Sequence, residues 1–215
     1  MRRDYFGRRQ FLRRLWIPGL PGCTLNPRMR RLTADAESLR TEFAGHPEIQ
    51  VLPLGYEPAD AYRLIFRLPG IALDAAGQPT IINHHQAVIQ LVAGYPREKP
   101  IAVMETAIFH PNFGPNIGDE ICIGDYWSPA QSLSDIVVTI GELIQYQRYN
   151  TRSPLNAVAA RWVAQNESIF PVGHVSLFQA EPNIQLGGPQ GAGTAQPTAV
   201  SLGPETGWAS GFSAT

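Results

Sequence analysis

The stretch from residue 107 to residue 134 reads AIFHPNFGPNIGDEICIGDYWSPAQSLS and decides both the fold and the candidate chemistry. It contains a His-Pro-Asn triplet at 110–112, a cysteine at 122, and the tetrapeptide Trp-Ser-Pro-Ala at 127–130. The Gly, Pro and Asn residues between these motifs predict a loop. A thiolate can attack or carry an acyl group, and an amide N–H can stabilise the charge on an attacked carbonyl oxygen. Cys122 is therefore the candidate nucleophile and Asn112 the candidate oxyanion donor.

Each of these two assignments has a structural alternative. Cysteine is among the most frequently buried residue types, so an isolated cysteine is more often part of a core. An asparagine in a turn commonly caps its own backbone. The sequence offers no adjacent His-Asp pair that could serve Cys122 as a dedicated base, and His110 is the nearest histidine.

The chain before this stretch predicts one helix followed by a four-stranded antiparallel meander, hence the α+β class. Asn26 and Pro27 are typical of an N-cap and a first helical position, and Gly-His-Pro at 45–47 ends the helix. Alternating or continuous apolar residues predict strands at 49–54, 62–68, 88–92 and 101–104, with a turn at 69–70 and a loop at 74–79. The pair His84-His85 is interpreted as a turn or strand edge and not as a metal site.

The chain after the stretch predicts helices. Ser132 and Asp135 resemble a capping box for a helix with an apolar stripe through Ile144, and Gly141 inside that helix indicates close packing. After Pro154 a last helix is predicted, whose core-facing stripe comprises Leu155, Val158, Ala159, Trp162, Val163 and Phe170.

The ordered motifs resemble the catalytic core of ubiquitin-conjugating (E2) enzymes. His-Pro-Asn, Ile-Cys-Ile at 121–123, Trp-Ser-Pro-Ala, the Tyr95-Pro96 pair with Pro100, and Pro-Leu-Asn at 154–156 occur in the order that the family shows. The resemblance covers residues 26–170, and it implies the UBC-like fold with an N-terminal helix, the meander sheet, an active-site loop and C-terminal helices. The spacing from Asn112 to Cys122 is slightly long, and that from Cys122 to Trp127 slightly short, beside common eukaryotic members.

The resemblance also implies roles for individual residues. Cys122 would carry a ubiquitin-like protein as a thioester and Asn112 would support its transfer, without a cofactor or a metal. Residues that the family uses to support the active site are His110, Pro111, Trp127 and Ser153. Residues implied in partner binding are Arg28, Arg30, Arg31 and Arg40 on the first helix, toward the E1-like activating enzyme, and Arg97, Pro129 and Ala130, toward an E3 ligase. Members that serve RING-type ligases tend to have an apolar residue at the position of Arg97, which puts a conventional E3 partner in doubt.

The two ends of the chain differ in composition from the part between them. Residues 1–25 form a basic arm, within the segment 1–31 that holds nine arginines and one acid, although the whole chain has a net charge of −1. Arg8 to Arg13 resembles a twin-arginine export signal, but the apolar run after it is short and interrupted by Pro18 and Gly19, so a cytoplasmic location is predicted. Residues 171–215 are rich in Gly, Pro and Ala with only two charges, which predicts a disordered tail.

The composition restricts the remaining possibilities. Cys23 and Cys122 lie in unlike contexts, so neither a disulfide framework nor a metal site is predicted, and no apolar run is long enough for a membrane span. Lys99 is the single lysine beside sixteen arginines. This reflects either an arginine-favouring genome or an advantage, for an enzyme that acylates lysines, in offering few of its own.

We therefore expect an E2-like enzyme that takes a ubiquitin-like protein from an E1-like enzyme and passes it to an amine on a target protein. The arginine-rich composition and the loop spacings suggest a bacterial member, such as those encoded in ubiquitin-like conjugation operons of anti-phage defence. The alternatives are an E2 variant that has kept the fold as a binding module, and a nucleic-acid-binding protein that uses its basic arm. The negative charge of the remainder and the lack of a recognised motif disfavour nucleic acid.

Overall fold

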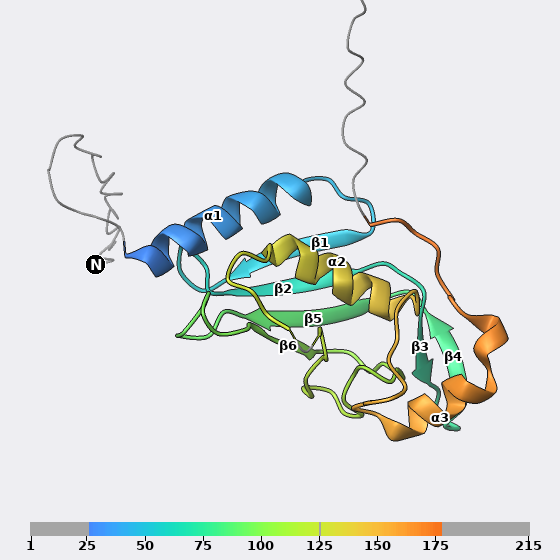
Figure 1. The fold of residues 1–215 in the computed structure, drawn as a ribbon. Coiled ribbons are helices and arrows are strands. Elements are labelled where there is room, and N and C mark those ends of the chain that lie inside the picture. Colours follow the sequence, from blue (N-terminus) through green and yellow to red (C-terminus); the bar gives the residue numbers. More distant parts are fainter. Residues whose placement is uncertain (1–25, 125, 178–215) are drawn as a thin grey trace, which may run out of the picture. The chain divides into compact units, whose positions relative to one another are not determined.

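The computed structural model describes residues 26–124 and 126–177 (Figure 1). The basic arm at 1–25 with Cys23, and the part of the predicted tail from 178 to 215, lie outside the described residues.

One helix, a four-stranded sheet and two further helices follow each other along the chain (Figure 1). In order they are α1 (Pro27–Glu42), β1 (Ile49–Leu54), β2 (Ala61–Phe66), β3 (Gly70–Leu73), β4 (Pro79–Ile82), β5 (His85–Gln90), β6 (Ile101–Met104), α2 (Leu133–Ile144), α3 (Ala157–Gln165) and a 3-10 turn (Glu167–Ile169). The main sheet is antiparallel with the order β1-β2-β5-β6. The predicted α+β, UBC-like architecture is confirmed.

The first helix begins where the sequence predicts it. The side chain of Asn26 accepts the backbone N–H of Arg28 at 3.0 Å, which satisfies one of the free donors of the first turn, and Pro27 occupies the first helical position. Helix α2 has the equivalent cap, because the hydroxyl of Ser132 accepts the N–H of Ser134 at 3.1 Å. Both helix starts thus follow from local sequence.

The core lies between the sheet and the two helices α1 and α2. Alternate residues of β2 and β5, among them Leu64, Phe66, Ala87 and Ile89, are fully buried beneath Leu32 of α1 and Ile140 of α2. Figure 1 shows α2 crossing in front of the sheet. Burial of apolar area at about 25 cal/mol per Å² is the dominant stabilising contribution of such a layer.

A two-stranded hairpin, β3–β4, is inserted between β2 and β5, and the sequence analysis did not predict it. The loop predicted at 74–79 forms the turn of this hairpin, and the strands on either side have four residues each, too few to give a periodic signal. The carboxylate of Asp74 accepts the N–H groups of Ala76 and Gln78, both at 2.8 Å, and Gly77 takes a φ of +75° in this turn. Strand β5 starts at His85, three residues before its predicted start.

The predicted boundary at residue 171 is wrong, because residues 171–177 belong to the folded unit. The backbone oxygen of Gln145 accepts the N–H groups of Val172 (3.0 Å) and Gly173 (3.2 Å), and its side chain exchanges two hydrogen bonds with Val175. Leu177 is buried in the main core. A Cβ on Gly141 would come within 2.3 Å of Leu177, so the close packing predicted at this glycine is confirmed.

The last helix is only partly the core element that its apolar pattern predicts. Ala159 and Val163 are buried, and Trp162 and Phe170 pack against them. Leu155 and Val158 are instead 47% and 58% exposed, and Leu155 precedes the helix, which starts at Ala157.

Candidate active site

The His-Pro-Asn triplet is held from within by the ring of His110. Its Nδ1 accepts the backbone N–H of Asn112 at 3.0 Å, and the ring is fully buried against Phe113 and Tyr146, with centroids 4.9 and 4.2 Å away. Burial lowers the pKa of His110 to about 3, although the backbone carbonyl of Arg148 favours its protonated form. At neutral pH the imidazole is therefore uncharged, and the nitrogen that could accept a proton is already occupied.

The triplet is fastened to the segment before α3 through Pro111. Its carbonyl oxygen accepts the N–H groups of Leu155 at 2.8 Å and Asn156 at 3.2 Å. Asn156 in turn caps α3 by accepting from Val158 and Ala159. Hydrogen bonds thus connect Pro111 to residues more than forty positions later in the chain.

Asn112 and Cys122 are neighbours in this arrangement. The backbone N–H of Cys122 donates to the carbonyl oxygen of Asn112 at 2.8 Å, and the adjacent pair Phe113 and Ile121 forms an isolated antiparallel bridge. Cys122 is partly exposed and forms no disulfide within the described residues. Cys122 is therefore not a fully buried core cysteine.

The side-chain amide of Asn112 has a fixed orientation. Its Oδ1 accepts the backbone N–H of Asn150 at 2.7 Å, and within the described residues its Nδ2 makes no hydrogen bond. Only 7% of Asn112 is exposed. Since an amide oxygen and nitrogen lie on opposite sides of one carbon, holding the oxygen aims the two N–H donors away from Asn150.

Ser153 lies on the same loop as Asn150. The Oδ1 of Asn150 accepts the N–H of Arg152 at 2.9 Å and, at 3.4 Å, that of Ser153, whose side chain is exposed. This loop therefore connects Ser153 to Asn112 through a single residue. Asn150 had no signal of its own in the sequence analysis, although an asparagine three residues before Ser153 is typical of such a turn.

Tyr146 is a second residue that the sequence analysis missed. It has a positive φ of 59°, its ring is buried between His110 and Phe170, and its hydroxyl donates to the carbonyl oxygen of Phe109. Burial raises the pKa of this hydroxyl above its ordinary value. A non-glycine residue with positive φ is uncommon and cannot be read from an apolar helical pattern, which explains why it was overlooked.

Trp127 connects the two loops that flank the thiol. Its indole N–H donates to the carbonyl oxygen of Pro96 at 2.8 Å, and its ring lies 5.9 Å from that of Tyr95. Arg97, Pro129 and Ala130, which the resemblance implies in partner binding, are exposed on these loops.

Of the four arginines predicted on the first helix, two make contacts within the chain. Arg31 binds the carboxylate of Asp35 through Nε (2.9 Å to both oxygens) and donates to the carbonyl oxygens of Pro129 and, at 2.6 Å, Gln131. The guanidinium of Arg28 donates to the carbonyl oxygen of Leu91 at 3.0 Å. These two therefore hold α1 to neighbouring loops, whereas Arg30 is exposed.

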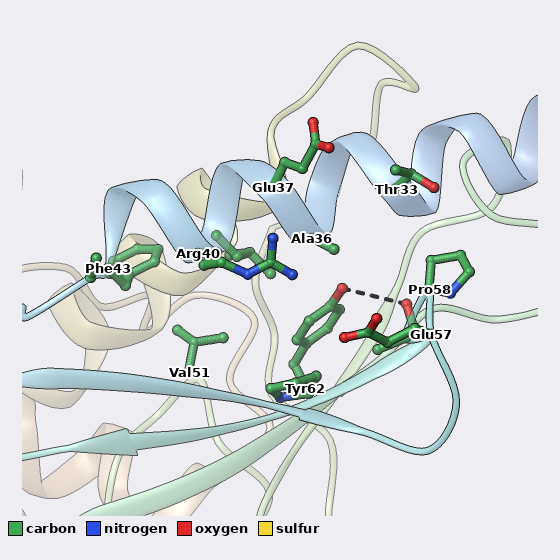
Figure 2. Close-up of a pocket in the computed structure, with 13 residues that line it drawn as sticks. Thr33, Ala36, Glu37, Arg40, Phe43, Val51, Glu57, Pro58 and Tyr62 are labelled. Carbon is green, nitrogen blue, oxygen red and sulfur yellow. Dashed lines mark hydrogen bonds between the residues drawn. The ribbon is translucent and has the colours of Figure 1, made fainter. Parts of the chain in front are cut away.

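Arg40 is exposed and borders a recess of about 580 Å³ between α1 and the β1–β2 segment (Figure 2). Figure 2 shows its side chain extending from α1 above Tyr62, whose hydroxyl donates to the carbonyl oxygen of Ala59 at 3.4 Å. None of the residues that line this recess belongs to the stretch 107–134, so the candidate chemistry does not use it.

Neither a metal cluster nor a membrane helix was found in the described ranges 26–124 and 126–177. No group of three potential His, Cys, Asp or Glu ligands comes together there. None of the helices there is both long and apolar enough to cross a bilayer.

Part of the chain is similar to ubiquitin-conjugating enzymes. Residues 82–172 match the family model described as ubiquitin-conjugating enzyme, a range that includes the triplet, Cys122, Trp127 and Ser153. The chain is also 32% identical over 107 residues to the ubiquitin-conjugating enzyme E2 27 of Arabidopsis thaliana. That alignment covers 48% of this chain and 54% of the relative, so the chain spans about half of the relative's length.

Proposed function

We propose that this chain, whose residues 82–172 are similar to ubiquitin-conjugating enzymes, carries a ubiquitin-like protein as a thioester on Cys122 and transfers it to an amine of a target protein. The observation that carries the proposal is that a partly exposed cysteine lies next to an asparagine whose side-chain amide is held in one orientation. The backbone N–H of Cys122 donates to the backbone oxygen of Asn112, and the backbone N–H of Asn150 donates to the side-chain oxygen of Asn112. The two N–H donors of the Asn112 side chain make no hydrogen bond within the described residues.

The first step is an exchange of thioesters. The Cys122 thiolate attacks the carbonyl carbon of the ubiquitin-like protein's C-terminal thioester on the E1-like enzyme. The new C–S bond forms as the old one breaks, and the E1 thiolate leaves and takes up a proton. Because both sides are thioesters, this step needs little driving force and no dedicated base, which agrees with a site whose only nearby histidine is buried and neutral.

The second step forms an amide. A target amine attacks the carbonyl carbon on Cys122, the carbonyl oxygen becomes negatively charged, and Nδ2 of Asn112 donates a hydrogen bond to it. The tetrahedral species then collapses, the C–S bond breaks, and the Cys122 thiolate leaves. The proton lost by the amine passes to solvent, because His110 has no free acceptor nitrogen. Ser153, exposed on the loop that also holds Asn112, would help to desolvate the arriving amine.

The proposed partners follow from this chemistry and from the exposed residues. The E1-like enzyme would contact Arg30 and Arg40 on α1, because Arg28 and Arg31 are engaged inside the chain. The loops with Arg97, Pro129 and Ala130 would contact a ligase if one is used.

An ATP-dependent activator implies a cytoplasmic location. The cellular setting that we propose, a bacterial conjugation operon in anti-phage defence, rests on the arginine-rich composition and the loop spacings, and the genes beside this one would test it.

The experiment is a loading assay. The purified chain is incubated with ubiquitin, ATP, Mg²⁺ and the ubiquitin-activating enzyme of Arabidopsis thaliana and, in parallel, with ubiquitin supplied as a C-terminal thioester of mercaptoethanesulfonate. We expect a one-to-one adduct that thiol reductants cleave, that Cys122→Ala abolishes, and that Cys122→Ser converts into a reductant-resistant ester. If neither donor loads Cys122, the carrier function is wrong, and the chain is better described as an E2-like binding module.

A further inference from the structure

The single lysine of the chain contacts the loop that follows the candidate nucleophile. Lys99 is exposed, and its Nζ donates to the carbonyl oxygen of Gly124 at 3.0 Å. Gly124 follows Cys122 by two residues, so their Cα atoms are separated by at most about 7 Å. The other sixteen basic side chains, all arginines, carry no amine that could be acylated.

The backbone at Lys99 is held in place by contacts of its loop, although the side chain of Lys99 is exposed. In the same loop, the carbonyl oxygen of Pro96 accepts the indole N–H of Trp127, and the hydroxyl of Tyr95 donates to the buried carboxylate of Asp35 at 2.6 Å. Pro100 next to Lys99 is buried. The Lys99 side chain has four flexible methylene groups on a fixed backbone. Rotation about their bonds lets the amine leave Gly124 and move toward Cys122 without a change in the loop.

We propose that Lys99 is the acceptor of a self-conjugation reaction, in which a ubiquitin-like protein passes from Cys122 to the Lys99 amine of the same molecule. This inference rests on the proposed function, since it requires the thioester on Cys122. The uncharged amine attacks the thioester carbonyl, a C–N bond forms and the C–S bond breaks. Cys122 leaves as a thiolate, which takes up one proton, and the product is an isopeptide.

The product would differ from the free enzyme at the loop of residues 95–100. The acylated nitrogen has no charge and keeps one N–H in place of three, so the ammonium contact with Gly124 is lost. A whole protein would then be attached to the loop that also presents Arg97. Self-conjugation would therefore remove the enzyme from its normal partners when no target amine consumes the thioester.

Three variants test the proposal in the full chain, with ubiquitin loaded as in the assay above and no target protein or free amine added. Lys99→Arg keeps a positive donor opposite Gly124 but offers no amine. Lys99→Arg with Arg67→Lys moves the only lysine to an exposed position outside the site. A tagged Cys122→Ala chain, mixed with loaded Lys99→Arg chain, reports transfer between molecules. After treatment with reductant, intact mass and peptide mapping separate modification of Lys99 from modification of the N-terminal amine.

We expect the wild-type chain to accumulate a reductant-resistant adduct at Lys99, with a rate independent of enzyme concentration. Lys99→Arg should form the reductant-sensitive thioester normally while its resistant adduct falls at least tenfold, and Arg67→Lys should not restore that adduct. The tagged Cys122→Ala chain should remain unmodified. A thioester that forms but never yields a Lys99 isopeptide, or one that modifies lysine at position 67 equally well, would overturn the inference while leaving the carrier function intact. Failure to form the thioester at all would count against the carrier function instead.

Discussion

The backbone N–H of Asn150 donates to Oδ1 of Asn112 at 2.7 Å, and this bond fixes the Asn112 amide with its Nδ2 directed away from Asn150. The carbonyl oxygen of Asn112 meanwhile accepts the N–H of Cys122 at 2.8 Å. One asparagine therefore connects the loop of Ser153 to the candidate nucleophile.

Asn112→Asp should separate loading from transfer. The aspartate keeps an oxygen for the Asn150 N–H but loses the N–H donor and adds a charge that repels the developing oxyanion. We expect Cys122 to load normally and transfer to free lysine to slow by roughly 10²–10³-fold, as for other single oxyanion donors. Single-turnover discharge of the thioester measures this. Asn83→Asp, an exposed change outside the site, is the control, and equal discharge by both variants would refute the role of Asn112.

Arg31→Ala should destabilise the fold, whereas Arg30→Ala should not. Without Arg31 the Asp35 carboxylate, whose side chain is only 8% exposed, would keep the Tyr95 hydroxyl as its remaining partner. Breaking such a pair costs about 3 kcal/mol, against less than about 0.5 kcal/mol at an exposed site. Urea unfolding at pH 7 would measure both variants. Adding Asp35→Asn to Arg31→Ala should restore part of the loss, since the uncompensated charge is then removed.

The folded state should lose stability as the pH falls below 6.5. Burial lowers the pKa of His110 to about 3 and that of His85 to about 4. Below pH 6.5 both histidines therefore bind protons in the unfolded chain while they stay neutral in the folded chain. The stability is fully present above 6.5 and declines toward pH 4 for His85 and pH 3 for His110. At pH 5 each histidine costs about 2 kcal/mol of unfolding free energy.

Urea unfolding between pH 7 and pH 5 checks the decline, and NMR of the histidine rings identifies its source. The ring signals of His85 and His110 should stay in their neutral positions throughout this range. A midpoint near 6.5 for either ring would show that its burial does not exclude the proton.

Gln145→Ala should release residues 172–177 from the folded unit. Gln145 is fully buried, and its side chain accepts the N–H of Val175 at 2.9 Å and donates to the carbonyl oxygen of Val175 at 3.1 Å. The substitution leaves the Val175 N–H unpaired, which costs about 1–3 kcal/mol, while the Val175 carbonyl oxygen keeps the side-chain N–H of Gln147 at 3.2 Å. Faster hydrogen exchange of the amides at 172–177 would report the release. Gln147→Ala is the matched control, since Gln147 bonds the same segment from an exposed position, and an equal effect would contradict the prediction.

The sequence by itself determined the elements that depend on local signals. Asn26 with Pro27 and Ser132 start helices because a side-chain oxygen can satisfy free N–H groups within its own turn. The alternation through β2 required one buried face, and Gly141 required a close neighbour. The motifs around Cys122 predicted the resemblance to ubiquitin-conjugating enzymes that the comparisons find over residues 82–172.

Only the tertiary structure decided which of the predicted residues are free to act. In the sequence Arg31 cannot be distinguished from Arg30. In the structure the Arg31 guanidinium is hydrogen-bonded to Asp35 and to carbonyl oxygens of the loop 129–131, which is about a hundred positions away. Residues 171–177 look like a tail, yet Gln145 and the space beside Gly141 hold them in the core. The neutral state of His110 likewise comes from the aromatic rings around it. Such long-range contacts leave no periodic or local trace, because they depend on which distant groups the folded chain brings within a few ångströms.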